Sequence, residues 1–154
     1  QGPMARDDLR LALHQQVQQS VQQGAQCLIG GYRPEGAGFY YPATLLTQVV
    51  PGMPAFDQEL FGPVLSMVSV ADIDQAIVLA NQSIYGLSAS VFTQDAQCAR
   101  RVMSALQVGS CAVNSQVRSQ LMMPFGGVRA SGYGRELGRT GLLSWLNHKS
   151  CYKL

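Results

Sequence analysis

The sequence predicts an α/β fold built on a parallel sheet. Three short apolar segments have the composition of strands, and two segments with helical periodicity alternate with them. Helices of about 10–15 residues in such an alternation form right-handed crossovers between parallel strands. The strands are residues 64–70, 88–93 and 110–114, and the two helices begin at Asp72 and Asp95. With 154 residues, of which 47% are hydrophobic, the chain is long enough for one domain with a sizeable core.

The segment before these strands predicts a helix followed by shorter elements. Two acids, Asp7 and Asp8, favour a helix N-terminus, and four apolar residues then follow at spacings of four, which places them on one helix face. They are Leu9, Leu13, Val17 and Val21, and Gly24 is expected to end the helix. The next expected elements are a strand at 27–29 with a turn at Gly30-Gly31, an extended segment at 39–46, and chain breaks at Pro51 and Pro54.

The apolar run from Val64 to Val70 predicts a strand buried on both faces. The two aspartates that begin the helices, Asp72 and Asp95, are of the residue type that caps helix N-termini. From residue 114 to residue 134 the chain is irregular and rich in glycine, and a helix is expected after it at 139–146. The tail, residues 150–154, is expected to form an edge strand.

Charged residues make up 13% of the chain, against roughly 25% in typical soluble domains. Because a small domain has a large surface for its volume, this low share predicts that other protein covers much of the surface. The chain is then part of something larger or of an oligomer. It begins with Gln1 rather than methionine, as expected either of a chain cut just before Met4 or of the interior of a longer protein.

Several cellular settings and partners are excluded. No apolar run approaches the roughly 18 residues of a membrane helix, and no basic-then-apolar leader opens the chain, so a cytoplasmic location is predicted. Residues 1–99 carry three basic and eight acidic side chains, and residues 100–154 carry eight basic and one acidic. The arginines of the basic part are dispersed and lack aromatic neighbours, so neither a nucleic-acid nor a membrane partner is expected.

The four cysteines, Cys27, Cys98, Cys111 and Cys151, are widely scattered and form no Cys-x-x-Cys pair. This spacing predicts reduced thiols and favours neither a metal site nor a disulfide framework. Cys27 and Cys111 are expected to be buried in strands. The two histidines, His14 and His148, lack a motif around them and are expected at the surface, so a Cys–His hydrolase is not favoured.

One segment combines an acid and an aromatic ring in a rigid setting. Glu59 and Phe61 are two residues apart and stand directly before Gly62-Pro63 and a strand. A carboxylate held beside a flat ring can accept hydrogen bonds from sugar hydroxyls and pack against a planar heterocycle. From the residues alone, a ligand site and a purely structural turn both remain open. The glycine-rich stretch 126–134 matches no phosphate-binding pattern that follows a strand.

Three motifs carry a resemblance to a known family. They are Glu59-Leu60-Phe61-Gly62-Pro63-Val64, then Asn81-x-x-x-Tyr85-Gly86-Leu87-x-Ala89-Ser90-Val91-Phe92, and then Pro124-Phe125-Gly126-Gly127-x-x-x-Ser131-Gly132-x-Gly134-Arg135-Glu136. Together with residues 2–6 and 39–45, they make the chain resemble the aldehyde dehydrogenase superfamily from end to end. Within that superfamily the chain is most similar to bacterial succinate-semialdehyde dehydrogenases.

The resemblance implies that the chain is the C-terminal part of the family's catalytic domain, an αβα arrangement around a parallel sheet. It implies oxidation of an aldehyde to the acid. A cysteine attacks the aldehyde, hydride passes to NAD or NADP, and a glutamate base activates the water that releases the acid. In the family, the cysteine, the base and the nucleotide-binding domain lie upstream of the segment that matches residues 2–6. No residue of this chain is therefore expected to be catalytic.

The resemblance carries three site residues to this chain. Glu59 matches the carboxylate that binds the nicotinamide ribose, and Phe61 matches the ring beside the nicotinamide. Ser119 lies in the family's substrate-entry loop, where the succinate-semialdehyde group uses a serine to bind the substrate carboxylate. Its neighbour Arg118 is interpreted as a surface residue, and Asn114 as satisfying backbone groups of the loop rather than contacting substrate.

The expected organisation is a partial catalytic domain at residues 1–134 and a C-terminal helix with an oligomerisation tail at 135–154. In the family this tail joins a sheet between subunits, so a homo-oligomer, either a dimer or a tetramer, is expected. The other expected partners are the rest of the full-length chain and a small aldehyde, with succinate semialdehyde as the candidate. Two alternatives without enzymatic activity remain open: a non-catalytic fragment, and a binding or assembly module that keeps part of the nicotinamide site.

Overall fold

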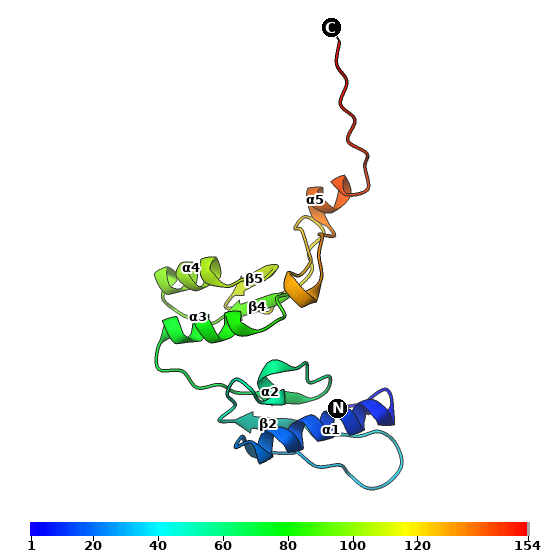
Figure 1. The fold of residues 1–154 in the computed structure, drawn as a ribbon, viewed down its shortest axis with the longest axis vertical. Coiled ribbons are helices and arrows are strands. Elements are labelled where there is room, and N and C mark those ends of the chain that lie inside the picture. Colours follow the sequence, from blue (N-terminus) through cyan, green and yellow to red (C-terminus); the bar gives the residue numbers. More distant parts are fainter. Residues whose placement is uncertain (154) are drawn as a thin grey trace. The chain divides into compact units, whose positions relative to one another are not determined.

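A computed structural model describes residues 1–153, which form two compact units (Figure 1). The first unit is Gln1–Asp72 and the second is Ile73–Leu154. Both units mix helices with short strands, so the expected α/β class is confirmed. The division at residue 72 reflects contacts within this chain, and the functional boundary between residues 134 and 135 stays a prediction.

The first unit is built on helix α1 (Asp7–Gln22), which has the predicted bounds within two residues. Leu13 and Val17, each 1% exposed, lie on its buried face. The buried Ser20 hydroxyl accepts a hydrogen bond from the amide of Ala55 (2.9 Å), which joins α1 to the short helix α2 (Pro54–Asp57). Pro54 therefore begins a helix instead of breaking the chain, because proline suits the first helical position, where no amide donor is needed.

Three strands form the sheet of the first unit, in the order β1-β2-β3. Strand β2 (Thr44–Thr47) pairs antiparallel with β1 (Gln26–Ile29) and parallel with β3 (Val64–Ser66). Only the end of the extended segment expected at 39–46 is a strand. The strand expected at 64–70 ends at residue 66, and Leu65 is 64% exposed. The prediction of burial on both faces is therefore wrong in this chain, where no described element covers the Leu65 side.

The segment before β2 is held by side chains rather than by a strand ladder. Tyr41 is 2% exposed, and its hydroxyl lies 3.1 Å from Nδ1 of His14 on α1. Burial raises the pKa of Tyr41 to about 12. His14 is half-buried by this contact, so its expected place at the surface is wrong. The pair fixes the chain that leads into β2 against α1.

The second unit contains the predicted crossover. Helix α4 (Ala96–Ala105) connects the parallel strands β4 (Ser88–Val91) and β5 (Ser110–Val113). As predicted, Asp95 caps α4, because its carboxylate accepts hydrogen bonds from the amides of Gln97 (2.7 Å) and Cys98 (3.2 Å). Helix α3 (Ile73–Gln82) precedes β4. The three strands of the predicted alternation nevertheless fall into two sheets, because β3 pairs with β2 and β4 pairs with β5.

An asparagine clamp joins the ends of the two helices of this unit. The Asn81 amide oxygen accepts a hydrogen bond from the backbone amide of Gln107 (2.9 Å), and its nitrogen donates to the carbonyl of Ala105 (2.9 Å). The Arg129 guanidinium donates to the carbonyls of Asn81 (2.9 Å) and Ser83 (2.5 Å). These bonds hold the C-terminal ends of α3 and α4 together.

The C-terminal part contains a 3₁₀ turn, η1 (Arg129–Ser131), and helix α5 (Gly138–Leu143), which is shorter than predicted. Beyond α5 the chain runs as an extended segment (Figure 1). Residues 150–153 form no strand, because no described segment lies beside them to pair with, and Leu154 lies outside the described residues. No described helix has both the length and the apolar character that crossing a membrane requires.

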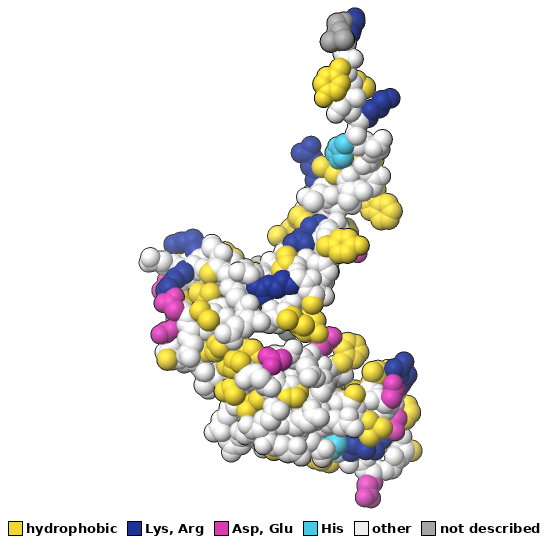
Figure 2. Space-filling model, in the orientation of Figure 1, with side chains coloured by type: hydrophobic (Ala, Val, Ile, Leu, Met, Phe, Trp, Pro, Cys, Tyr) yellow, Lys and Arg dark blue, Asp and Glu magenta, His cyan; other side chains and the backbone are white. Residues whose placement is uncertain are grey.

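Large apolar side chains are exposed on both units (Figure 2). They include Phe61 (67% exposed), Met122 (87%) and Trp145 (89%). Exposed apolar surface of this kind is a site of association or of aggregation. We expect the isolated chain to bind a hydrophobic dye and to associate, as measured by dye fluorescence and light scattering. A monodisperse monomer that melts cooperatively without binding the dye would show that this surface needs no cover.

Candidate functional site

The segment that carries Glu59 and Phe61 is a pair of tight turns between α2 and β3. The amide of Gly62 donates to the carbonyl of Leu60 (2.8 Å), and the amide of Val64 donates to the carbonyl of Gly62 (2.8 Å). Consecutive three-residue turns of this kind are common at strand ends. The carbonyl of Pro63 then accepts from the amide of Thr44 (2.9 Å), which joins the turn to β2.

Packing on the core side fixes this turn. Leu60 packs against the buried cluster of the first unit. A Cβ atom at Gly62 would lie 2.4 Å from Cδ2 of Leu13, so α1 leaves no room for a side chain there. From the same helix, Gln16 donates to the side-chain oxygen of Gln58 (2.9 Å) and to the carbonyl of Glu59 (3.2 Å). Gln16 belongs to a glutamine-rich stretch without a motif, so the sequence gives no signal for this role.

The side chains of Glu59 and Phe61 themselves are exposed. No described residue forms a side-chain hydrogen bond or an ion pair with the Glu59 carboxylate. The Phe61 ring borders a small hollow of about 220 Å³ that Met4, Ala5, Leu9 and Gly62 also line. A fixed turn thus presents an unpaired carboxylate and a flat ring, a combination that fits a ligand with hydroxyl groups and a planar ring.

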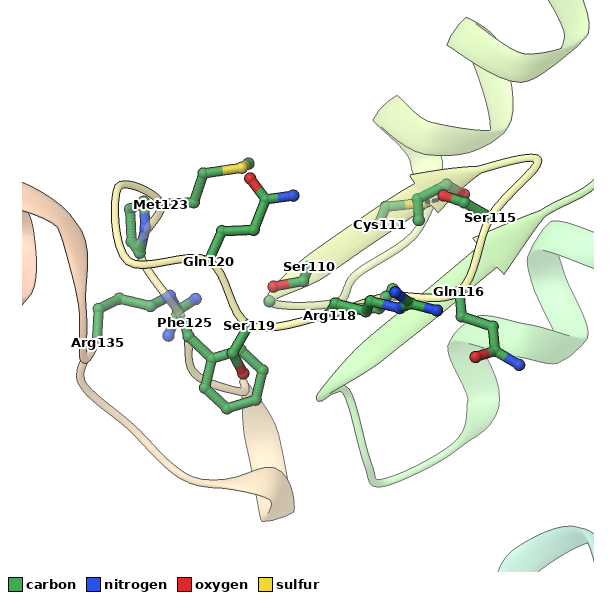
Figure 3. Close-up of a pocket in the computed structure, with 14 residues that line it drawn as sticks. Ser110, Cys111, Ser115, Gln116, Arg118, Ser119, Gln120, Met123, Phe125 and Arg135 are labelled. Atoms are coloured by element: carbon green, nitrogen blue, oxygen red, sulfur yellow. Dashed lines mark hydrogen bonds between the residues drawn. The ribbon is translucent and has the colours of Figure 1, made fainter.

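Ser119 lies in the second unit, at a cavity of about 740 Å³ (Figure 3). Strand β5 and the loop that follows it form most of the wall, with further residues from the segment 123–135. The lining residues are Gly109, Ser110, Cys111, Ala112, Ser115, Gln116, Val117, Arg118, Ser119, Gln120, Met123, Pro124, Phe125 and Arg135. Ser119 is exposed, and no hydrogen bond joins its hydroxyl to a described residue.

Phe125 gives the cavity its aromatic wall, at the end away from Cys111 and Ser115 (Figure 3). It is half-buried, and its backbone exchanges two hydrogen bonds with Glu136, at 2.8 and 2.7 Å. These bonds close the glycine-rich segment 126–134 into a loop. Phe125 belongs to the third sequence motif, and only its place six residues after Ser119 indicates a shared wall.

The cavity is electropositive. Two arginines line it together with neutral polar side chains, and no carboxylate does. Arg118 is exposed, as predicted, whereas Arg135 is half-buried and donates from Nη1 to the carbonyls of Gly127 (2.8 Å) and Gly134 (2.7 Å). No described acid pairs with Arg135, so its charge is available to an anion. Arg135 belongs to the third sequence motif, but no charge pattern along the chain indicates its place at the cavity.

The cysteine at the cavity is not activated. Cys111 is half-buried, and burial raises the pKa of its thiol. No described basic side chain forms a hydrogen bond with it, and a neutral thiol is a poor nucleophile. Cys27 is also half-buried, and its thiol donates to the carbonyl of Ile29 (3.3 Å). The predicted burial of both is only partial, because each lies in a strand that borders a cavity.

The four cysteines are free, and the described residues contain no cluster of three or more histidine, cysteine or acidic side chains that could hold a metal ion.

Glycines near the cavity allow close packing of backbone at some positions and form turns at others. A Cβ atom at Gly109 would lie 1.6 Å from the carbonyl oxygen of Gly126, and one at Gly127 would lie 2.5 Å from Cβ of Ser131. Gly132 and Gly134 have no such neighbours, but their φ values of +111° and +80° favour glycine. The close approach places the loop that begins at Phe125 directly against β5.

Asn114 has the predicted structural role. It follows β5 and bonds through its side chain to the backbone of Thr93, with both distances at 2.9 Å. The three predicted ligand residues fall in different units: Glu59 and Phe61 lie in the first, and Ser119 lies in the second. Each group is therefore a surface of its own unit.

Both surfaces lie on an α/β fold that carries the three sequence motifs. The family model described as "Aldehyde dehydrogenase family" matches residues 1–151. The chain belongs to the aldehyde dehydrogenase family. The match extends over nearly every residue and confirms the resemblance predicted from the three motifs.

Individual relatives agree with this assignment. The chain is 45% identical over 152 residues to succinate semialdehyde dehydrogenase [NAD(P)+] Sad of Escherichia coli (strain K12), covering 99% of this chain and 33% of the relative. It is 43% identical over 148 residues to succinate-semialdehyde dehydrogenase [NADP(+)] of Deinococcus radiodurans, covering 96% of this chain and 31% of the relative. The crystal structure of lactaldehyde dehydrogenase from Escherichia coli matches with a TM-score of 0.90 and 35% identity, over 95% of this chain and 31% of that one. The chain thus spans about a third of the length of the relatives it matches.

Proposed function

We propose that this chain is the C-terminal part of an NAD(P)-dependent dehydrogenase that oxidises an aldehyde bearing a second, anionic end, with succinate semialdehyde as the candidate substrate. The observation that carries the proposal is the cavity at Ser119. Two arginines and five neutral polar side chains line it, with no carboxylate. The neutral polar residues are Ser110, Ser115, Gln116, Ser119 and Gln120. The names of the first relatives are consistent with this substrate.

In this proposal Ser119 donates its hydroxyl proton to the substrate carboxylate. A hydrogen bond to a charged group contributes roughly 1.5–3 kcal/mol in a site without competing water. Arg135 stabilises the same negative charge, because its guanidinium is held by two backbone carbonyls and has no acidic partner among the described residues. Phe125 bounds the space between these groups and packs against the carbon chain of the substrate.

The first unit has a surface that fits the cofactor. The exposed Glu59 carboxylate has no partner among the described residues, and it can accept hydrogen bonds from the two hydroxyls of a ribose. The exposed Phe61 ring can pack beside a nicotinamide. When bound, NAD or NADP would accept the hydride that leaves the aldehyde carbon. The role of this chain is then to orient the ring that receives the hydride, while the cysteine nucleophile and the glutamate base belong to the rest of the enzyme.

We also propose that the tail joins a homo-oligomer, a dimer or a tetramer. The support is the exposed apolar surface beyond α5, where Trp145 is 89% and Tyr152 is 92% exposed. A second copy of the chain could cover these rings and pair with the extended segment at residues 150–153. A cytoplasmic location is part of the same proposal.

Replacing Glu59 with glutamine in the full-length enzyme should impair the binding and positioning of the cofactor more than those of the aldehyde. Glutamine keeps the shape but removes the charge that strengthens the ribose hydrogen bonds, and one such bond contributes roughly 1.5 kcal/mol. We therefore expect hydride transfer to slow about tenfold and the KM for the cofactor to rise. Single-turnover and steady-state kinetics measure both. Glu35 is an exposed acid of the same unit, so Glu35→Gln is the control. If Glu59→Gln changes neither the cofactor KM nor the rate of hydride transfer, Glu59 has only a structural role.

The substrate proposal is tested by steady-state kinetics of the full-length enzyme. The formation of reduced nicotinamide is followed with succinate semialdehyde and with an uncharged aldehyde of the same chain length. We expect the larger kcat/KM for succinate semialdehyde, because only this substrate has a carboxylate for the electropositive cavity. A preference for the uncharged aldehyde would remove the substrate assignment and leave the family assignment intact.

A further inference from the structure

The loop that carries Ser119 begins at an unusual residue. Asn114 has a φ of +51°, in the left-handed region that few residues other than glycine adopt. Its backbone amide donates to the carbonyl of Val91 (2.8 Å) as the last bond of the β4–β5 pair. Its side-chain oxygen accepts from the amide of Thr93 (2.9 Å), and its side-chain nitrogen donates to the carbonyl of Thr93 (2.9 Å). The chain thus leaves β5 in a direction that three hydrogen bonds determine.

The residue that Asn114 clamps is itself fixed. The hydroxyl of Thr93 accepts a hydrogen bond from the amide of Asp95 (3.1 Å), and Asp95 caps helix α4. A continuous set of hydrogen bonds therefore runs from the N-terminus of α4, through Thr93, to Asn114. These hydrogen bonds connect the start of the loop that carries Ser119 to helix α4.

The far end of the loop has an anchor of its own. The amide of Gly138 donates to the carbonyl of Leu121 (2.9 Å), and the Phe125 backbone is bonded to Glu136. Between the two anchors, no hydrogen bond to another described residue holds residues 115–119, and four of these five residues are exposed. The position of Ser119 is therefore set by its anchors, of which Asn114 is the nearer on the N-terminal side.

We propose that Asn114 is a positioning residue, whose clamp on Thr93 places the Ser119 hydroxyl and thereby sets the preference for aldehydes with an anionic end. This inference rests on the proposed function. Asn114 is not among the residues that line the cavity, so it acts through the loop. Asparagine is suited to the task because it tolerates the left-handed conformation and has both a donor and an acceptor, whereas aspartate only accepts and glycine offers neither.

Three variants of the full-length enzyme separate the clamp from the backbone conformation. Asn114→Ala removes both bonds and strains the backbone, Asn114→Gly removes both bonds without strain, and Asn114→Asp keeps the accepted bond alone. The readout is the ratio of kcat/KM for succinate semialdehyde to that for the uncharged aldehyde of the same length. We expect Ala and Gly to lower this ratio by about 10- to 100-fold, because a misplacement of about 1 Å can cost about 100-fold. Asp should give an intermediate ratio.

Two controls show whether the effect passes through Ser119. Asn81 makes the same pair of side-chain bonds to backbone, at Ala105 and Gln107, and none of these three residues lines the cavity. Asn81→Ala should therefore lower the melting temperature as Asn114→Gly does and leave the ratio unchanged. The double variant Asn114→Gly/Ser119→Ala should have the ratio of Ser119→Ala alone. Once the Ser119 hydroxyl is deleted, a displacement of the loop can no longer lower the ratio through it.

Several results would overturn the inference. A wild-type ratio in Asn114→Gly would show that the backbone conformation alone places the loop. An equal change of the ratio in Asn81→Ala would show a general effect of stability, and additive losses in the double variant would show that Asn114 acts apart from Ser119. In each case the wild-type enzyme still prefers the anionic aldehyde. If the wild-type enzyme lacks that preference, the proposed function fails, and this inference fails with it.

Discussion

The isolated 154-residue chain should show no NAD(P)-dependent aldehyde oxidation, while the full-length enzyme is active. The mechanism that the resemblance implies needs an activated cysteine upstream of the segment that matches residues 2–6, so none of the four cysteines here is expected to be the nucleophile. Cys111, the one at the cavity, has a thiol pKa raised by burial and no described base beside it. Loss of the nucleophile removes most of a covalent route, so the expected fall in rate is at least about 10⁴-fold.

The purified chain is assayed for formation of reduced nicotinamide at high protein concentration, with the full-length enzyme as the positive control. Cys111→Ser in the isolated chain serves as the second control. Turnover by the isolated chain that disappears in this variant would place a working nucleophile at Cys111. It would also overturn the view that this chain supplies binding groups alone.

The second large effect is expected for Ser119→Ala in the full-length enzyme. The variant loses a hydroxyl that donates to the substrate carboxylate, a bond of roughly 1.5–3 kcal/mol, so kcat/KM for succinate semialdehyde should fall about 10- to 100-fold. For an uncharged aldehyde of similar length the value should barely change, because the lost bond has no counterpart there.

Ser115→Ala is the matched control for this prediction. Ser115 belongs to the same loop and lines the same cavity, but it lies at the end away from Phe125 (Figure 3). Its loss should affect both substrates little and equally. If Ser119→Ala lowers kcat/KM for both aldehydes to the same extent, Ser119 shapes the loop and does not recognise the carboxylate.

The elements with local signals could be predicted from the sequence. The spacing of Leu13 and Val17 predicts the buried face of α1, and Asp95 predicts the start of α4, because periodicity and capping act over a few residues. The pairing of β3 could not be predicted in this way. The alternation of strands and helices does not indicate that β3 pairs with β2, since this pairing depends on a segment that lies 20 residues upstream in the sequence. Exposure of Leu65 follows from the same non-local cause.

In the candidate site too, features with a local sequence signal could be predicted, and features that depend on the fold could not. The turn that holds Glu59 and Phe61 could be predicted because Gly62-Pro63 directly follows them in the sequence, whereas their ligand roles come from the resemblance and stay a prediction. Gln16, which pins that turn from α1, and Arg135, which brings a charge to the cavity, were missed. Each contacts residues that are close to it only in the folded structure, so no spacing along the sequence indicates the contact.

A structure of the full-length enzyme with bound succinate tests the central claim most directly, because succinate is the expected product and keeps the anionic end of the proposed substrate. One carboxylate oxygen should lie within about 3.2 Å of the Ser119 hydroxyl oxygen, in the electropositive cavity. Succinate bound with both carboxylates away from Ser119, and with water in its place at that hydroxyl, would contradict the claim that this cavity recognises the substrate.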